Sequence, residues 1–461
     1  MIGPGIRKIL AVAGATLPML VGWSLPAHGS GFAAARFGGE HGNVTTDNAT
    51  ALYYNPAGIG FSEGTTLFLD GSLALRHATW EHAAAPTDTP DPPGAAGSST
   101  GKATLFNVFG GPMFGATTRR GPVAFGLGFM VPFGGRAHWG TNDQFKNSAT
   151  FPLAADGIQR WHSIEGALTF AYLTAGVAYR LGRFSLGVTG NLIRSSISST
   201  QAKTPTGFGD PDPTREGRAT LDVVGYQGSF GLGVMVEAID NRLWLGAGYQ
   251  AQPGLGPMKM TGTLKTTYMD SSTVFPVDFH QALPDSLRVG GRFRPIPALE
   301  LRLSGELTRW SVMQTQCLGF QDQACLVDAS GSDATPKGST IQNLRRHWKD
   351  TYGVRAGASG WIRPAVELFG GVGFETAAVP DETLEPGLAD ANNLAGALGA
   401  RVRASQTVFV AASYTHIQYF DRDNTGKSQL AMAMLPTKLP DGGGKYTQWV
   451  GVFNVNLQLQ F

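Results

Sequence analysis

QWVGVFNVNLQLQF, residues 448–461, alternates between apolar and polar side chains. Successive side chains of a β-strand point to opposite faces, so this stretch predicts a strand with one apolar and one polar face. The apolar face carries Trp449, Gly451, Phe453, Val455, Leu457, Leu459 and Phe461, and the polar face carries Gln448, Asn454, Asn456, Gln458 and Gln460. In a transmembrane β-barrel the first face meets lipid and the second meets the lumen. A soluble sandwich would bury the apolar face instead, and this strand alone does not separate the two.

Two earlier segments repeat the alternation with charged residues on the polar face. In the first, Leu287, Val289 and Phe293 alternate with Arg288, Arg292 and Arg294; in the second, Leu299, Leu301, Leu303 and Leu307 alternate with Glu300, Arg302, Ser304 and Glu306. A charge on the lipid face of a barrel costs about 2–4 kcal/mol at the midplane. We therefore expect these arginines and glutamates to point inward and neutralise one another. In a soluble protein the same residues would form a solvated face.

The breaks between such segments alternate in length. Short turns are expected at residues 117–121, 181–183, 239–242, 294–298, 362–365 and 403–407, and long polar loops at 82–101, 140–159, 201–217, 268–284, 313–346, 379–392 and 421–445. Single-chain bacterial barrels have an even number of antiparallel strands, short periplasmic turns and longer outer loops. The rhythm predicts an all-β fold, a transmembrane antiparallel β-barrel of about 14 strands over residues 64–461.

Composition agrees with this fold. Gly accounts for 63 of 461 residues, charged residues for only 15 %, and the mean hydropathy of −0.06 is far below that of a helical membrane protein. Alternating strands average apolar and polar residues, which hides a barrel from hydropathy. The net charge of +2, without a basic stripe, makes nucleic acid an unexpected partner.

The N-terminus indicates export. Arg7 and Lys8 precede the apolar residues 9–23, and Ala27-His28-Gly29 offers small residues at the two positions a signal peptidase reads. We expect a signal peptide over residues 1–29 and a bacterial outer-membrane location; a retained transmembrane helix is the alternative. Cys317 and Cys325 are the two cysteines, and in an oxidising envelope they are candidates for a disulfide, with two free thiols as the alternative.

Motifs of catalysis are missing from the sequence. There is no HExxH, no GxSxG and no His or Cys set at metal-ligand spacing, so we expect no enzyme, metal or cofactor. Arg345 and Arg346, at the outer end of an expected strand, are candidates to meet lipopolysaccharide phosphates, or else ordinary solvated loop charges.

The stretch before the first expected strand is not strand-like, and it carries a resemblance. Ser30-Gly31-Phe32 opens the expected mature chain, and residues 47–58, DNATALYYNPAG, precede the first strand. These segments resemble the FadL/TodX family of hydrophobic-compound transporters, which share a short Gly-Phe tail and an Asn-Pro-Ala-Gly element. Further similar elements are Thr308-Arg309-Trp310-Ser311, Trp348-Lys349-Asp350-Thr351-Tyr352 and the spacing of Pro380, Pro386 and Asp390.

The resemblance implies fourteen strands around a lumen closed by an N-terminal plug, residues 30–63. In such transporters substrate binds near the outer face, reaches an apolar site, and leaves sideways through the wall after the tail moves. Gating is thereby assigned to Ser30, Gly31 and Phe32 of the tail and to Asn55, Pro56 and Ala57. The alternatives from the residues alone are a disordered linker for the segment and a simple turn for the trio. The wall opening depends on a kink in an early strand, for which the candidates are Pro122, Gly126, Gly128, Pro132, Gly134 and Gly135.

The expected function is passive, plug-gated uptake of long-chain fatty acids or other hydrophobic compounds. The alternatives are a surface-binding, adhesin-type barrel and an ordinary diffusion porin. Expected partners are the hydrophobic substrate, outer-membrane lipid and lipopolysaccharide, and the barrel-assembly machinery, which would read the last strand ending at Phe461. We expect a monomer.

Overall fold

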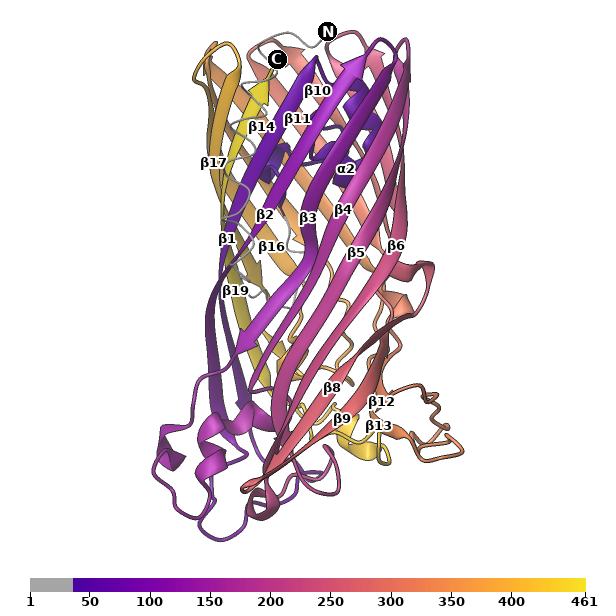
Figure 1. The fold of residues 1–461 in the computed structure, drawn as a ribbon. Helices are drawn as coiled ribbons and strands as arrows, with labels where there is room; N and C mark the ends of the chain where they lie inside the picture. Colours follow the sequence, from indigo (N-terminus) through magenta and orange to yellow (C-terminus); the bar gives the residue numbers. More distant parts are fainter. Residues whose placement is uncertain (1–35) are drawn as a thin grey trace.

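The computed structural model describes residues 36–461, and within them fourteen antiparallel strands close into a ring. In ring order these are β1 (Thr65–His82), β2 (Gly101–Arg120), β3 (Val123–His138), β4 (Glu165–Leu181), β5 (Phe184–Lys203), β6 (Gly217–Ile239), β7 (Leu243–Gln250), β10 (Ser286–Ile296), β11 (Leu299–Thr308), β14 (Thr351–Arg363), β15 (Val366–Glu375), β16 (Asn393–Arg403), β17 (Val408–Tyr419) and β19 (Lys445–Gln460). The last strand pairs with the first, Leu457 opposite Leu69, which closes the barrel (Figure 1). The predicted barrel and its strand number are confirmed.

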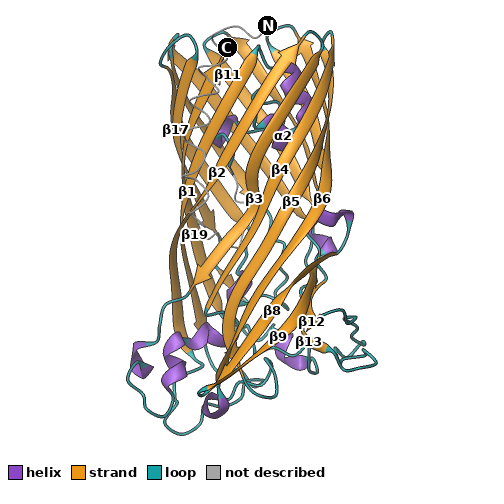
Figure 2. Cartoon of the chain, viewed as in Figure 1, coloured by secondary structure: helices purple, strands orange, loops and turns teal. Residues whose placement is uncertain are grey.

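Five further strands lie outside this ring: β8 (Met258–Tyr268), β9 (Ser271–Gln281), β12 (Thr315–Phe320), β13 (Thr340–Arg345) and the short β18 (Arg422–Asp423). β8 pairs with the outer part of β6, and β9, β12 and β13 follow in order, so they extend the wall at the long-loop end (Figure 2). The sequence prediction of pure loop for residues 268–284 and 313–346 was wrong. These strands lie beyond the lipid-facing band, so they lack its apolar alternation.

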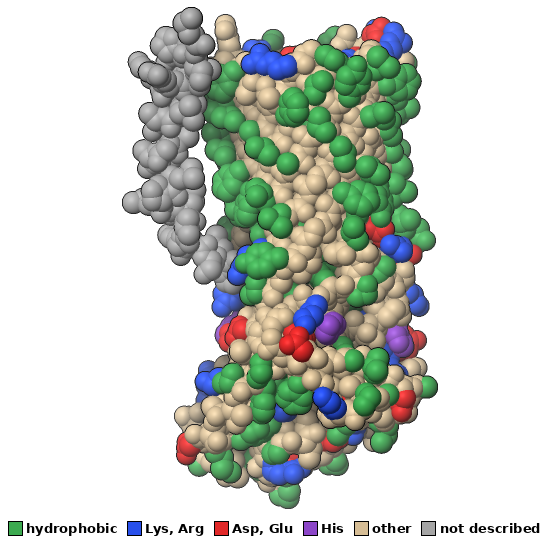
Figure 3. Space-filling model, turned by 45° about the vertical axis from the view of Figure 1, so that its right-hand side comes forward, with side chains coloured by type: hydrophobic (Ala, Val, Ile, Leu, Met, Phe, Trp, Pro, Cys, Tyr) green, Lys and Arg blue, Asp and Glu red, His purple; other side chains and the backbone are tan. Residues whose placement is uncertain are grey.

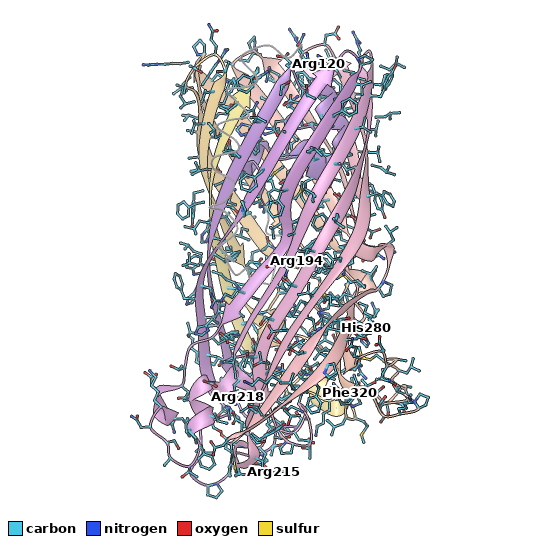
Figure 4. All side chains as sticks on the ribbon, in the orientation of Figure 1. Arg120, Arg194, Arg215, Arg218, His280 and Phe320 are labelled. Carbon is cyan, nitrogen blue, oxygen red and sulfur yellow. A yellow bond between two sulfur atoms is a disulfide. The ribbon has the colours of Figure 1, made fainter. Side chains whose placement is uncertain are left out.

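The faces of the ring strands have the predicted sense. On β19, Phe453 is 46 % exposed on the outside, whereas Asn454 is 1 % exposed on the inside. On β5 the outward side chains run from Phe184 through Leu192 and are followed by Arg194, close to the length expected for a spanning strand (Figure 4). On the face that Figure 3 shows, apolar side chains gather over the short-turn half of the molecule. The apolar faces of the strands therefore point outward.

The predicted inward charges also meet in pairs. Arg288 and Glu306 approach to 2.8 Å across β10 and β11, and Arg294 lies 2.7 Å from Glu300. All four belong to the inward-facing set, while Leu287 and Leu303 on the same strands are exposed outward. Pairing inside the barrel removes the cost that each charge would have in hydrocarbon.

Helical turns are short. Those before the first strand are η2 (Gly39–His41), α2 (Ala51–Tyr54) and η3 (Pro56–Phe61); the others lie between strands, namely η4 (Asp143–Phe145), η5 (Pro152–Asp156), η6 (Ile158–Trp161), η7 (Pro213–Arg215), η8 (Pro253–Leu255), η9 (Trp310–Val312), η10 (Pro386–Leu388) and η11 (Leu430–Met432). No helix among residues 36–461 is long and apolar enough to cross a membrane.

Candidate functional site

Residues 36–63, which we call the inner segment, lie within the ring of strands near the short-turn end (Figure 1). Asn55 is fully buried there, and its side-chain amide donates to the carbonyl of Val44 at 2.8 Å and to that of Val234 on β6 at 3.0 Å. The carbonyl of Ala57 accepts a hydrogen bond from Ser185 on β5 at 2.8 Å. The Asn55-Pro56-Ala57 element is thus fastened to the inner face of β5 and β6.

Glycines on the inner wall make this close approach possible. A Cβ atom on Gly187 of β5 would collide with the backbone of Pro56, and one on Gly233 of β6 would collide with the side-chain oxygen of Asn55. Only a residue without a side chain fits at these positions. The high glycine content of the chain therefore serves, in part, to seat the inner segment.

Charged groups hold the opposite side of the inner segment. The Arg288 guanidinium donates to the hydroxyl of Tyr53 at 3.1 Å, and Arg292 on the same strand lies 3.0 Å from the Asp47 carboxylate. The ring of His41 lies 2.7 Å from the carboxylate of Glu367 on β15. The inner segment is thus held across the lumen from two sides. Ion pairs and hydrogen bonds bind it to β10 and β15, and it packs closely against the wall glycines of β5 and β6.

The predicted gating residues divide between described and undescribed parts of the chain. Ser30, Gly31, Phe32 and the expected signal peptide over residues 1–29 lie outside the described residues. Asn55, Pro56 and Ala57 lie together, as described above. Two further inner-segment residues, whose contacts the sequence reasoning missed, lie against β2 and β3: Ala49 against Gly115, and Leu52 against Gly126. Both contacts could have been suspected from the glycines at inward positions of β2 and β3, such as Gly115 and Gly126, because these positions leave room for another segment.

The wall between β2 and β3 is paired along only part of its length. Seven residue pairs join them, from Arg120 opposite Val123 to Phe114 opposite Phe129. Their next backbone pairing in the described chain is an isolated bridge between Leu105 and Trp139, the residue that follows β3. Residues 106–113 of β2 therefore have no ladder to β3, although they are paired with β1 on the other side. We call this interval the open seam.

A bulge in β3 explains the open seam. Met130 pairs with Tyr172 of β4 and Phe133 with Phe170, so that Val131 and Pro132 together face one residue of β4. A bulge bends its strand, and proline removes a donor from the ladder, which is why proline within sheets occurs at such places. Among the kink candidates from the sequence, Pro132 is the one at the bulge. In Figure 1, β3 bends away from β2 at this height.

An aromatic cluster lies inside the barrel behind the open seam. The Phe133 ring packs against Phe170, Tyr172 and Trp310 at centroid distances of 6.3, 6.5 and 6.4 Å. Trp310 and Trp348 meet edge to face at 5.0 Å. These rings belong to the main buried apolar cluster of the barrel, together with Met113 and Met130 from the two strands of the seam. The interior next to the seam is thus apolar.

A cavity opens at the long-loop end. Its empty volume is about 1030 Å³ when the solvent space of its mouth is included. Its apolar lining comes from β3 to β6, the strands beyond the ring and the adjoining loops, and consists of Ala137, Ala167, Leu168, Ile197, Phe208, Ala219, Leu221, Leu264, Phe279, Leu318, Leu344, Leu388 and Leu439. Leu168 and Leu388 also pack against the main buried apolar cluster, to which the aromatic rings belong. The cavity therefore borders the apolar interior of the barrel.

One side of this cavity is polar. The Arg346 guanidinium pairs with the Glu385 carboxylate at 2.5 Å and donates to the side-chain oxygen of Gln316 at 2.7 Å, while the His162 ring lies 2.9 Å from Glu385. Burial raises the pKa of the Glu385 carboxyl, but Arg346 and the hydrogen bond with His162 outweigh burial and lower it to about 2. Arg346 is 3 % exposed. The reading of Arg346 as a lipopolysaccharide contact or a solvated loop charge was wrong, because a loop distant in sequence covers it.

The structure joins Cys317 of β12 to Cys325 in a disulfide, with Cα atoms 6.4 Å apart. Cys317 lies between the cavity residues Gln316 and Leu318, so the bond ties one strand of the cavity wall to the loop that follows it. Whether the two sulfurs are oxidised in the bacterium stays a prediction. Within residues 36–461 no group of three or more His, Cys, Asp or Glu side chains is placed to hold a metal ion.

Comparison with known proteins then assigns the chain. The family described as "Outer membrane protein transport protein (OMPP1/FadL/TodX)" matches residues 12–447. The chain belongs to the FadL/TodX family. It is therefore a bacterial outer-membrane transporter of hydrophobic compounds and not an enzyme. The comparison with curated proteins gave no match.

Solved FadL/TodX structures share the fold at low sequence identity. A Pseudomonas aeruginosa FadL homologue is 17 % identical with a TM-score of 0.72, covering 95 % of this chain and 98 % of its own. The Ralstonia pickettii toluene transporter TbuX is 14 % identical with a TM-score of 0.60, covering 94 % and 99 %. The P. putida toluene transporter TodX is 13 % identical with a TM-score of 0.61, covering 90 % and 94 %. At these identities the likeness concerns the fold alone.

Proposed function

We propose that this FadL/TodX protein takes up apolar small molecules through the outer cavity and the aromatic interior, and releases them sideways through the open seam into the membrane. The observation that carries the proposal is the seam itself, an interval of wall without ladder bonds directly beside an apolar interior. The shared residues Leu168 and Leu388 give continuity between cavity and interior.

The route suits hydrophobic cargo on physical grounds. Transfer of apolar surface back into water is unfavourable, so a passage that leads from an apolar cavity into lipid avoids that step. Outside the barrel, beside the paired end of β2 and β3, an apolar groove is lined by Leu67, Leu69, Phe114, Leu127, Phe129, Leu173, Leu457 and Leu459. Cargo leaving the seam would meet hydrocarbon or this groove.

The inner segment acts as the main part of the plug in this proposal, and the whole plug comprises residues 30–63. Its hydrogen bonds and ion pairs with β5, β6, β10 and β15 block the lumen to water, and movement of the tail Ser30, Gly31 and Phe32 would open the path. Asn55, Pro56 and Ala57 hold the segment on the wall while the tail moves. Pro56 has a fixed φ and Asn55 caps the following turn, so the bend is well defined.

The cargo class is hydrophobic, with long-chain fatty acids and aromatic hydrocarbons as the two main candidates. TbuX and TodX are named as toluene transporters, and the Pseudomonas aeruginosa relative is named as a FadL homologue. We also propose that the protein is a monomer in contact with outer-membrane lipid and lipopolysaccharide. The barrel-assembly machinery would recognise its last strand, which ends at Phe461.

Uptake of radiolabelled toluene and of a long-chain fatty acid into cells expressing the full protein tests this function, with ion conductance in planar bilayers alongside. We expect uptake of apolar compounds above cells without the barrel, and little conductance. Deletion of residues 30–32, and separately the replacement of Asn55, Pro56 and Ala57 by serines, should impair uptake while the barrel still assembles.

The two alternative functions predict different results. A diffusion porin would conduct ions freely and would not favour apolar cargo over small polar solutes. An adhesin-type barrel would give no uptake at all. Unchanged uptake in both variants would remove the gating role from these residues.

A further inference from the structure

We propose that the outer cavity selects uncharged amphiphiles, molecules with an apolar chain and a neutral hydrogen-bond acceptor, over ionised fatty acids. Three observations lead there: a charge pair that neutralises itself, an arginine whose donors already have partners, and a buried amide nitrogen without a partner. The inference rests on the proposed function, because it treats this cavity as the outer part of the uptake route.

The first observation is the charge balance. Arg346 and Glu385 are the only Lys, Arg, Asp or Glu residues that line the cavity in the described part of the chain. They bind each other at 2.5 Å, so the Lys, Arg, Asp and Glu side chains of the lining carry no net charge. A ligand carboxylate near Arg346 would also lie near the carboxylate of Glu385. Attraction and repulsion of similar size then oppose each other, so ionised cargo gains little.

The second observation is that the guanidinium already has its partners. Its Nε donates to Gln316 at 2.7 Å, and Gln316 in turn donates to Gln281 at 2.6 Å. This chain of hydrogen bonds holds Arg346 against the wall. Recognition of a carboxylate by arginine usually uses two parallel hydrogen bonds, and that geometry is occupied here by Glu385 and Gln316. Arg346 is therefore a structural cation and not a free anchor.

The third observation is the amide of Gln342. Its side chain is 6 % exposed and lines the cavity, and its nitrogen has no hydrogen-bond partner among residues 36–461. Its cross-strand neighbour on β12 is Leu318, which pairs in turn with Phe279 on β9, so the next two positions across the sheet from Gln342 are apolar. An unsatisfied buried donor costs free energy that a bound acceptor would recover. Gln342 thus provides a neutral donor without a protein partner, next to the apolar side chains of the lining.

A ligand that satisfies all three features carries an alcohol, ketone or ester oxygen at one end of an apolar chain. Its oxygen would accept a hydrogen bond from Gln342, and its chain would lie along Ile197, Leu221, Leu264 and Phe279 toward Leu168. The assigned specificity residues are Gln342, which binds the acceptor, and Glu385, which cancels the charge of Arg346.

The test compares three probes of equal chain length, dodecane, dodecan-1-ol and dodecanoate, at alkaline pH where the acid is ionised. Radiolabelled probe is partitioned between buffer and phospholipid vesicles with or without the full protein. We expect excess binding of dodecanol over dodecanoate by about tenfold, the effect of one discriminating interaction of ordinary strength. Gln342→Leu should lower dodecanol binding by roughly two- to tenfold and leave dodecane binding unchanged.

Two variants test the role of the charge pair. Glu385→Gln leaves Arg346 uncompensated and should raise dodecanoate binding above that of dodecanol. The double variant Arg346→Gln with Glu385→Gln is neutral again and should restore the preference for dodecanol, which separates charge from altered packing. Near-UV circular dichroism of each variant checks that the barrel is folded.

The outcomes separate the inference from the function on which it rests. If dodecanoate binds as well as dodecanol to the wild-type protein, or if Glu385→Gln does not change their ratio, the selectivity is overturned while the uptake function stands. If none of the three probes binds above protein-free vesicles, the uptake route through this cavity is overturned, and the selectivity with it.

Discussion

The seam between β2 and β3 differs from the neighbouring seam between β4 and β5, although both lie in one barrel wall. β4 and β5 pair without interruption over 17 residues, from Glu165 opposite Thr200 to Leu181 opposite Phe184. β2 and β3 pair over seven and then separate at the bulge that contains Pro132. The same polypeptide chemistry gives a closed wall in one place and an interrupted one in the other.

The difference shows what a membrane barrel can tolerate. A peptide group without a partner costs several kilocalories per mole in hydrocarbon, and irregular backbone persists there only where it borders protein or a cavity. The open seam borders the aromatic interior, with Met113 and Met130 buried on its inner side. An interrupted ladder in such a place is retained at a cost, which agrees with a role in cargo release.

Deletion of Pro132 should have the largest effect, because it would remove the bulge from β3 and allow β2 and β3 to pair along the open seam. Val131 would then face one residue of β4, and the alternation of buried Met130, outward Val131 and buried Phe133 would be kept. We expect uptake of apolar cargo to fall to the background of cells without the barrel. The measurement is radiolabelled uptake, with heat-modifiable gel mobility to check assembly. Wild-type uptake in the deletion variant would disprove lateral release at this seam.

A matched pair of proline substitutions tests whether the two seams differ in ladder bonding. The Gly140 amide donates to the carbonyl of Thr104, so the peptide groups of Thr104 face β3. Peptide groups of a strand alternate in direction with a period of two residues, so those of Val108 also face β3. Val108 has no ladder partner there. Leu192→Pro in β5 removes a ladder bond and should destabilise the barrel by about 3 kcal/mol or more. Val108→Pro should cost about 1 kcal/mol or less. Both side chains are outward and exposed, and urea unfolding in vesicles measures the two values. Equal losses would mean that the open seam is bonded after all.

Substitution of a wall glycine tests the closed side as the seat of the inner segment. Gly187→Val would push the Cβ branch into the backbone of Pro56 and displace the segment, so we expect ion conductance in planar bilayers to rise severalfold. Gly190→Ala on the same strand is the control, since nothing lies within 4 Å of its added Cβ. Conductance that stays low in the valine variant would show that the lumen is closed by something other than this segment.

The smallest effect is expected beyond the ring, where the disulfide supports a strand of the cavity wall. Replacement of Cys317 and Cys325 by serine should lower the local stability of β12 and β13 by about 2 kcal/mol, because the bond closes a short loop. Hydrogen exchange of the backbone amides of these strands measures the change. Thiol labelling of the unfolded wild-type protein should find no free thiol, and full labelling would favour the reduced alternative.

Much of the barrel could be predicted from particular residues. The alternation through Phe453, Asn454 and Val455, and the paired Arg288 and Glu306, gave the in–out sense correctly, since lipid penalises the reversed arrangement. The strands beyond the ring were not predicted. β9 and β12 do not face lipid, so their sequences lack the apolar alternation on which the prediction depended. The open seam was predicted only as a kink, since a bulge of one residue leaves no local mark beyond a proline and several glycines.

The cavity could not be predicted at all. His162, Arg346 and Glu385 lie in three separate loops, and only tertiary structure brings them together at 2.9 Å and 2.5 Å. In the sequence Arg346 looks like an ordinary surface cation, and Gln342 like any polar residue of a loop. Their burial depends on loops whose paths no periodic pattern encodes.

The sequence by itself determined that this chain forms a transmembrane barrel, how many strands it has, and which face of each meets lipid. Those properties depend on the period-two pattern and on the cost of polar groups in hydrocarbon, both of which act locally along each strand. Tertiary structure alone decided where the wall is interrupted, how the inner segment is fastened, and what the cavity can bind. These depend on register and on contacts between residues hundreds of positions apart, so no single segment contains the information.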